Sequence, residues 1–163
     1  MAETEYLPAT LIPLSMVPAI GEFVCYFGAT DAELNRLIWH VIGVEPDAGR
    51  EITADSPYQV RAALLERLAP VRIKDDKDRG KIIKLAQRFM DVASYRHRLL
   101  HDESYYLSPS TDTFGVLRAK TKTFTEFSEK TLSDKTTLCI RLMSRMQQYQ
   151  IRNPAWNDDA QFP

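Results

Sequence analysis

The chain has 163 residues, of which 44% are apolar and 26% are charged, and its formal net charge is −1. This length is enough for one domain with a hydrophobic core, and the composition excludes a chain that is disordered throughout. The near-zero charge excludes a strongly basic nucleic-acid packaging protein but leaves room for a local RNA site. Two cysteines, both within apolar helical patterns, do not make a disulfide scaffold, so we expect a reducing, cytoplasmic location.

Residues 1–15 are expected to form an irregular N-terminal arm. The stretch is acidic and is interrupted by Pro8 and Pro13. It lacks the basic start and the apolar run of a signal peptide. No apolar run elsewhere approaches the ~20 residues that a helix needs to cross a bilayer, so we expect no association with a membrane.

The first long helix is predicted from near Ser15 to Ile42, because apolar residues recur there at helical spacing. An alternative places a break at the sequence GATD, followed by a second helix. We favour one continuous helix, because Phe27, Leu34 and Val41 keep a seven-residue step across that point.

Residues 43–56 have the composition of a loop. Ser56 and Pro57 then predict the cap and the first residue of a second helix, which is expected to run to Pro70. A link of mixed charge follows it. A third helix is predicted over 77–100, again from the spacing of its apolar residues.

The pattern changes after this third helix. Two short β-like runs, Tyr105–Leu107 and Phe114–Arg118, flank a turn rich in Ser, Pro, Thr and Asp and predict a hairpin. A last helix is predicted from about 124 to 150, and 151–163 are expected to form a polar tail. The predicted fold class is therefore all-α: a helical bundle of four or more helices with a small β-hairpin before the last helix.

The sequence SYRHRLLHDES, residues 94–104, holds two of the three histidines. Arg96 and His101 are five residues apart, about 140° on a regular helix. They should converge only if the helix ends between them, and the polar residues Asp102, Glu103 and Ser104 suggest that it does. Arginine forks onto phosphate oxygens and histidine exchanges protons near neutral pH. Such a pair suffices in principle for metal-free RNA cleavage, the histidine moving a proton and the arginine stabilising phosphoryl charge.

Two other interpretations of this segment stay open. Cations at a helix C-terminus are favoured by the helix dipole by roughly 0.3–1 kcal/mol each, so the segment could be a charged helix end without function. Residue types alone favour this interpretation. His97 and His101, at i and i+4, also have a zinc-ligand spacing, to which Asp102 or Glu103 could add a carboxylate. The pair lacks the glutamate of an HExxH motif, and we predict no metal and no other cofactor.

The segment RHRLLH consists of Arg, a polar residue, three further positions and His, and it resembles the motif of the HEPN superfamily (higher eukaryotes and prokaryotes nucleotide-binding). The sequences GEFVCYFGATDAELNRLIWHVIGV and GREITADSPYQVRAALLERLA are similar to those of uncharacterised bacterial HEPN-like proteins. The resemblance spans about residues 16–150 and implies a homodimer in which two copies of the motif meet. It implies that Arg96 and His101 are the catalytic pair and that His97 supports them. Asp102, where related proteins often carry Gly, would either help the histidine act as an acid or repel RNA.

Many HEPN proteins are metal-independent endoribonucleases of toxin–antitoxin, phage-defence or RNA-processing systems, and others are non-catalytic. The resemblance therefore implies RNA cleavage at a dimer interface, and the alternative is a silent module that binds nucleic acid, nucleotide or a partner protein. Expected partners are a second copy, RNA and an antitoxin or defence-operon protein. Candidate RNA contacts are Tyr105 and Tyr106, one of which would face outward to stack on a base, and the basic residues Arg118 and Lys120.

Overall fold

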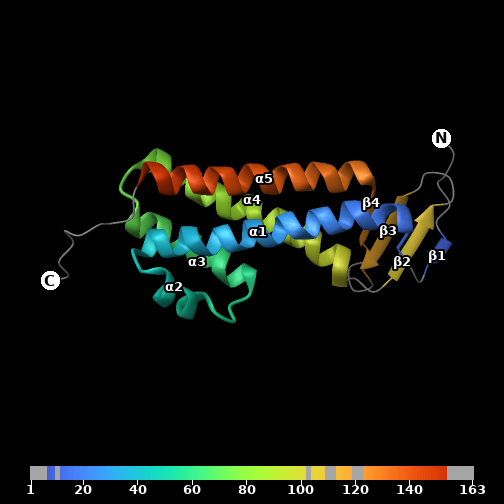
Figure 1. Ribbon diagram of the computed structural model, residues 1–163, viewed down its shortest axis with the longest axis horizontal. Coiled ribbons are helices and arrows are strands. Elements are labelled where there is room, and N and C mark those ends of the chain that lie inside the picture. The colour runs from blue at the N-terminus through green and yellow to red at the C-terminus, as the bar shows by residue number, and fades with distance from the viewer. Residues whose placement is uncertain (1–6, 10–11, 102–103, 109–112, 119–122, 154–163) are drawn as a thin grey trace. The chain divides into compact units, whose positions relative to one another are not determined.

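The computed structural model describes residues 7–9, 12–101, 104–108, 113–118 and 123–153. The elements, in chain order, are β1 (Leu7–Ala9), the 3-10 helix η1 (Leu14–Met16), α1 (Val17–Ile42), α2 (Pro46–Thr53), α3 (Tyr58–Arg72), α4 (Asp76–His101), β2 (Ser104–Ser108), β3 (Thr113–Arg118), β4 (Thr123–Phe127) and α5 (Glu129–Arg152) (Figure 1). The predicted fold class is confirmed, since helices make up most of the described chain and β2 and β3 form the hairpin.

The chain divides into two compact units, which are described separately. Unit 1 comprises Met1–Phe27 and Val92–Leu138, and unit 2 comprises Gly28–Asp91 and Cys139–Pro163. The three long helices α1, α4 and α5 each contribute residues to both units. The strands all belong to unit 1, and α2 and α3 belong to unit 2.

The long helices begin and end close to where the sequence predicts. Helix α1 is continuous to Ile42, which confirms the prediction of a single helix across GATD. Helix α4 starts with Asp76 and Asp78 in its first turn, where acidic side chains stabilise the positive end of the helix dipole. Helix α3 starts one residue later than predicted, with Pro57 as its cap, and it continues past Pro70 by two residues.

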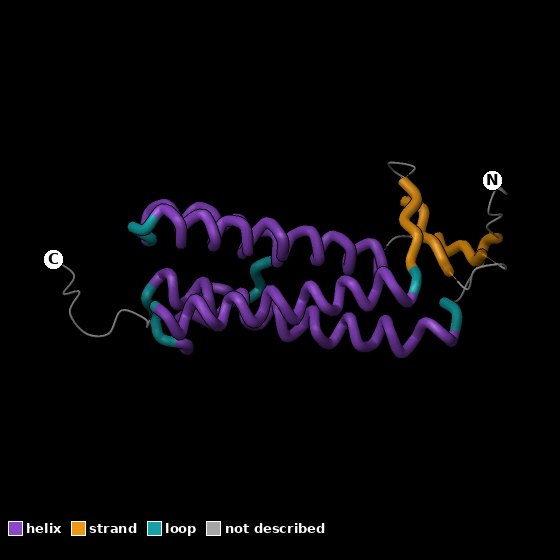
Figure 2. Tube along the Cα trace, turned by 90° about the horizontal axis from the view of Figure 1, so that it is seen from above, coloured by secondary structure: helices purple, strands orange, loops and turns teal. Residues whose placement is uncertain are grey.

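Unit 1 contains a four-stranded antiparallel sheet in the order β1-β2-β3-β4 (Figure 2). The two outer strands are additions to the predicted hairpin. Strand β1 pairs with β2 and lies in the segment predicted to be an irregular arm. Strand β4 pairs with β3 and lies where the last helix was predicted to begin, so the predicted start near 124 is wrong.

The start of α5 is fixed by a reciprocal cap. The backbone N–H of Thr131 donates to Ser128 Oγ at 3.2 Å, and the backbone N–H of Ser128 donates to Thr131 Oγ1 at 2.9 Å. These bonds satisfy two backbone donors and set the first turn of the helix after Ser128. The preceding residues pair with β3, and Phe127 is fully buried with its ring stacked on that of Phe114 at 5.1 Å. Strand pairing and this aromatic contact therefore outweigh helix formation before residue 128.

Unit 2 contains a short helix, α2, where a loop was predicted. The indole of Trp39 donates to Thr53 Oγ1 at 3.1 Å, and that hydroxyl donates to the carbonyl of Gly49 at 2.9 Å. A Cβ on Gly49 would lie 2.4 Å from Trp39 Cγ, so only glycine lets α2 approach the ring this closely. The loop prediction is wrong because it did not include this long-range contact with Trp39.

Within unit 2, part-buried polar contacts join α1 with α3 and α5. Arg61 of α3 forks onto Asp31 of α1 at 2.8 and 2.9 Å and also donates to Asn35. The carboxylate of Glu33, of which 3% is exposed, accepts from Arg36 at 2.8 Å and from Gln150 of α5 at 2.7 Å. Since buried charges must be paired, these contacts specify how α1, α3 and α5 pack within the unit.

Candidate functional site

The Arg–His cluster, defined as Arg96, His97 and His101, lies in the last two turns of α4 in unit 1. The helix continues through His101, so the prediction that it ends between Arg96 and His101 is wrong. The two side chains nevertheless meet, with Arg96 Nη1 3.4 Å from His101 Nε2. Five residues correspond to about 7.5 Å of helical rise and 140° of rotation, a gap that only a side chain as long as arginine can span.

The guanidinium of Arg96 is positioned by an aromatic ring. Its Cζ lies 5.7 Å from the centre of the Phe27 ring, and its buried Nε has no hydrogen-bond partner among the described residues. The ion pairs formed by the described carboxylates do not include Arg96. Its charge is therefore held by cation–π packing and remains available to an external anion.

A chain of aromatic contacts connects this position to the sheet of unit 1. The ring of Phe27 packs on Phe23 at 6.4 Å, Phe23 meets Tyr95 edge-on at 5.5 Å, and Tyr95 lies 4.9 Å from Phe127 of β4. The Tyr95 hydroxyl donates to Thr131 Oγ1 at 3.1 Å, and burial raises the pKa of Tyr95 above its ordinary value. These contacts fix the turn of α4 that carries Arg96, because Tyr95 is its neighbour in the sequence.

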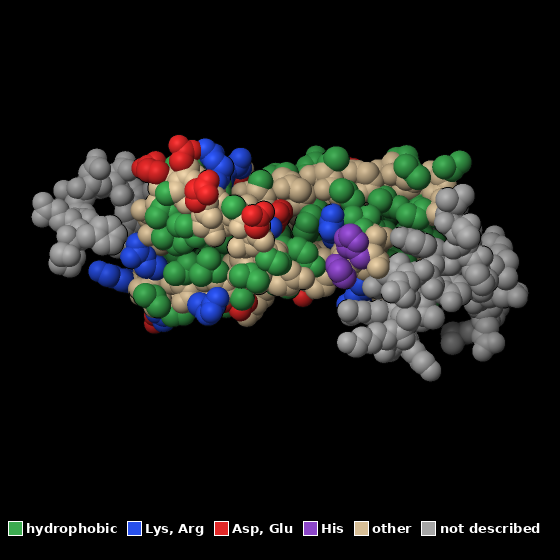
Figure 3. All heavy atoms as spheres, turned by 90° about the horizontal axis from the view of Figure 1, so that it is seen from below, with side chains coloured by type: hydrophobic (Ala, Val, Ile, Leu, Met, Phe, Trp, Pro, Cys, Tyr) green, Lys and Arg blue, Asp and Glu red, His purple; other side chains and the backbone are tan. Residues whose placement is uncertain are grey.

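The two histidines of the cluster lie together at the surface. Their ring centres are 5.1 Å apart with planes tilted by 40°, as expected for residues at i and i+4. His101 is exposed and His97 is partly buried. Figure 3 shows histidine side chains grouped on one surface, with Lys or Arg side chains beside them.

The histidine spacing provides two nitrogen ligands for the alternative metal site. Among the described residues, no group of three or more His, Cys, Asp or Glu side chains is placed to hold an ion. A zinc site at His97 and His101 would thus need ligands from elsewhere. Asp102 and Glu103, which the sequence offered for this role, lie outside the described residues.

The structure also places some of the other predicted site residues. Tyr105 and Tyr106 lie on β2, opposite Val116 and Gly115 of β3, and Arg118 is the last residue of β3. The prediction that one of the two tyrosines faces outward concerns side chains outside the described part of the structure. Lys120 lies outside the described residues, as does the predicted supporting residue Asp102.

Two side chains near the cluster were not singled out as site residues from the sequence. Phe27, which the sequence indicated only as part of a helical apolar pattern, lies against the Arg96 guanidinium. Arg98 donates to Thr125 Oγ1 of β4 at 3.3 Å and so connects α4 with the sheet. Neither contact leaves a signal in local sequence spacing, because each joins segments that are far apart in the chain.

Comparison with known proteins gives no match to a family model and no significant match to a curated protein or a solved structure. Among the described helices, none is long and apolar enough to span a membrane.

Proposed function

We propose that the chain is a metal-independent endoribonuclease of the HEPN type that acts in the cytoplasm as a homodimer. The observation that carries the proposal is the 3.4 Å approach of Arg96 Nη1 to the exposed His101 Nε2. One position on the surface of α4 thereby combines a permanent positive charge with a group that exchanges protons near neutral pH. A second copy of the motif across a two-fold axis would supply the further proton-transfer group that strand cleavage needs.

The contact suggests how the pair would work on RNA. An arginine nitrogen can only donate, so a neutral His101 accepts at Nε2 and carries its own proton on Nδ1. When a phosphate engages the guanidinium, Nε2 is released and can take the proton of the ribose 2′-hydroxyl. The 2′-oxygen then bonds to phosphorus, the bond to the 5′-oxygen breaks, and the partner subunit's His101 protonates the leaving oxygen. Arg96 stabilises the charge that develops on the phosphoryl oxygens, and His97 supports the ring of His101.

The proposal is tested with purified wild type and His101→Ala on a mixed RNA pool in the presence of chelator. Wild type should cut the pool and leave 2′,3′-cyclic phosphates or their hydrolysed products, and the variant should not. His101 is exposed at a helix end, so the variant should keep the far-ultraviolet circular dichroism of the wild type. Equal cleavage by both proteins would assign the activity to another site or a contaminant.

The dimer is tested by solution mass, which should be twice the monomer mass of 18.7 kDa. A monomer at micromolar concentration would remove the basis for a site composed of two motifs. A confirmed dimer that cleaves no RNA would favour the catalytically silent module instead. Copurification with an antitoxin or defence-operon protein would fit either function, because such a partner shows the biological system to which the chain belongs and does not show whether the chain cleaves RNA.

A further inference from the structure

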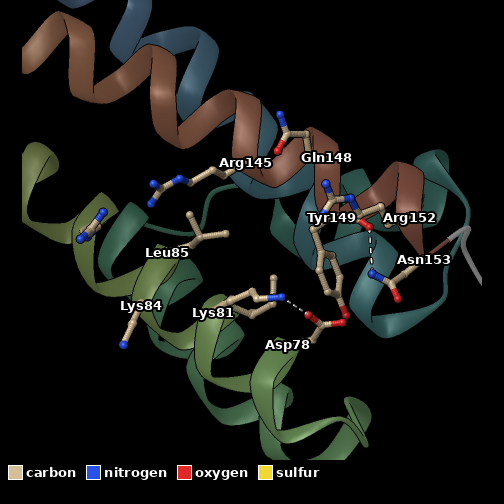
Figure 4. A pocket seen from close by; sticks show the side chains of 11 residues that line it. Asp78, Lys81, Lys84, Leu85, Arg145, Gln148, Tyr149, Arg152 and Asn153 are labelled. Atoms are coloured by element: carbon tan, nitrogen blue, oxygen red, sulfur yellow. Dashed lines mark hydrogen bonds and ion pairs between the residues drawn. The ribbon is translucent and has the colours of Figure 1, made fainter.

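Unit 2 contains a pocket of about 500 Å³ between α4 and α5 (Figure 4). Its volume lies within the range of about 300–1,000 Å³ that is usual for small-molecule sites. The buried side chains of Ile82 and Leu85 and the ring of Tyr149 give it an apolar lining. Figure 4 shows Tyr149 extending from α5 toward Asp78 and Lys81 of α4.

Five cationic side chains surround this apolar lining: Lys81, Lys84, Arg88, Arg145 and Arg152. We call the cavity with these five cations the basic pocket. One acidic residue, Asp78, lines it with them and pairs with Lys81 at 2.6 Å. The other four cations form no ion pair with a described carboxylate. Four positive charges are therefore in excess at one pocket of a chain whose overall net charge is −1.

Both walls of the pocket repeat one spacing. On α4 the positions i, i+4 and i+7 are occupied by Lys81, Leu85 and Arg88. A cation thus lies about one turn before and one turn after an apolar residue. The matching set on α5 is Arg145, Tyr149 and Arg152. Residues at i, i+4 and i+7 share a helix face, so the cations are presented together toward the pocket.

Helix stability does not account for this accumulation of charge. The dipole favours cations in the last turn of a helix, which explains Arg152 but not the three cations in the N-terminal half of α4. Lys84 and Arg88, four residues apart, repel each other on the same helix. Like charges that gather without carboxylate partners are instead typical of a site that binds a multiply charged anion.

We propose that the basic pocket binds a small phosphorylated ligand that carries two or more phosphate groups next to a flat apolar group, the chemistry of a nucleoside polyphosphate. The guanidinium groups of Arg88, Arg145 and Arg152 fork onto phosphate oxygens, which suits them to adjacent phosphates. The base packs on Leu85 and Tyr149. Burial, and the nearby negative charge of Asp78 and Asp75, raise the pKa of Tyr149, so the phenol stays neutral beside the bound anion.

The proposal is tested by calorimetric titration of the full chain with ATP, ADP, AMP and adenosine without divalent cations. Affinity should rise with the number of phosphates, and adenosine should bind weakest. Binding should weaken as salt is raised, because the rim of the pocket is exposed. The absence of saturable binding of ATP and ADP below about 1 mM would overturn the proposal. So would a short 5′-hydroxyl RNA that binds the pocket more tightly than ATP does.

Variants locate the site. Arg145→Ala should weaken ATP binding by about tenfold or more, since it removes a charged hydrogen-bond donor. Arg141→Ala is the matched control, because Arg141 is exposed one turn earlier on α5 and does not line the pocket. Equal affinity in the two variants would overturn the assignment. Asp78→Asn should strengthen ATP binding, because it removes the acidic group from the lining, and weaker binding would contradict an anion site at this pocket. His101→Ala should leave ATP binding unchanged, so failure of the proposed ribonuclease activity is distinguishable from failure here.

Discussion

The Arg–His cluster of unit 1 and the basic pocket of unit 2 gather cations in different ways. The cluster comes from six consecutive residues of α4, and two of its three members are histidines. The pocket draws on two helices whose contributing residues are more than fifty positions apart, and its lining contains neither histidine nor cysteine. The cluster thus holds groups that can transfer protons, whereas the pocket holds permanent charge around an apolar lining. These compositions fit the two proposals, phosphate cleavage at the cluster and phosphate binding in the pocket.

The contacts that hold the two regions in place also differ, being aromatic in unit 1 and charged in unit 2. Packing of Phe27, Phe23 and Tyr95 positions the cluster. In unit 2 the helices are joined by buried charge, as at Glu33 and at the pair of Arg61 with Asp31. We therefore expect that a substitution in one region leaves the activity of the other unchanged.

The largest effect is expected from Arg96. Arg96→Ala and Arg96→Lys should each lower kcat/KM for RNA by about 100-fold or more, because a lysine cannot reproduce the two-pronged phosphate contact. Steady-state cleavage assays measure this loss. Titration with ATP should give the wild-type affinity in both variants. If Arg96→Lys retained full cleavage, or if either variant lost ATP binding, the division between the two regions would fail.

Gly49→Ala tests the scaffold of unit 2. The new Cβ would lie 2.4 Å from the Trp39 ring, so the free energy of unfolding should fall by about 1–3 kcal/mol. Gly80→Ala is the matched control, since its Cβ meets nothing within 4 Å, and it should be neutral or stabilising by about 0.5–1 kcal/mol. Denaturant titration of both variants measures the difference. If Gly49→Ala left the free energy of unfolding unchanged, α2 would not depend on the contact with Trp39.

Phe27→Leu sharpens the role of the aromatic support. Loss of the ring under Arg96 should reduce RNA cleavage by roughly two- to fivefold, consistent with about 0.5–1 kcal/mol for an exposed cation–π contact. Phe23→Leu removes a ring from the same aromatic chain, and Phe23 packs on Phe27 and Tyr95. Kinetics below the unfolding temperature should show a larger defect in the first variant, because only Phe27 lies against the guanidinium. A similar loss in both would mean that the rings act through general packing.

The smallest effect concerns His40, whose ring meets Tyr149 edge-on at 6.0 Å in unit 2. Burial lowers the pKa of His40, while a hydrogen bond with the backbone of Asn153 opposes that shift. The unfolded chain therefore binds a proton more readily than the folded one, and stability should decline as the pH falls below about 6.5. His40→Gln should remove part of this decline, as measured by unfolding titrations between pH 8 and pH 5. Parallel curves for the two proteins would show that His40 does not contribute.

Features that depend on neighbouring residues can be predicted from the sequence alone. Helical periodicity was enough for α1, α3 and α4, because each buries a stripe that recurs every three or four residues. The pairing of β2 with β3 is equally local, since the two strands are close neighbours in the sequence. The same holds for the Arg–His cluster, which is encoded within one helix, although the length of the arginine side chain, rather than an early helix end, brings Arg96 to His101.

Features that join distant segments depend on packing in the folded chain. Phe127 is in a strand because it stacks on Phe114 and pairs with β3, although the segment around it has an apolar pattern that also suits a helix. Helix α2 depends on Trp39, which lies outside its own sequence. The basic pocket needs the cations of α4 and α5 together, and each set alone resembles an ordinary solvated helix face. Local spacing specifies which face a helix presents, but which distant face it meets is set by packing and charge pairing across the folded chain.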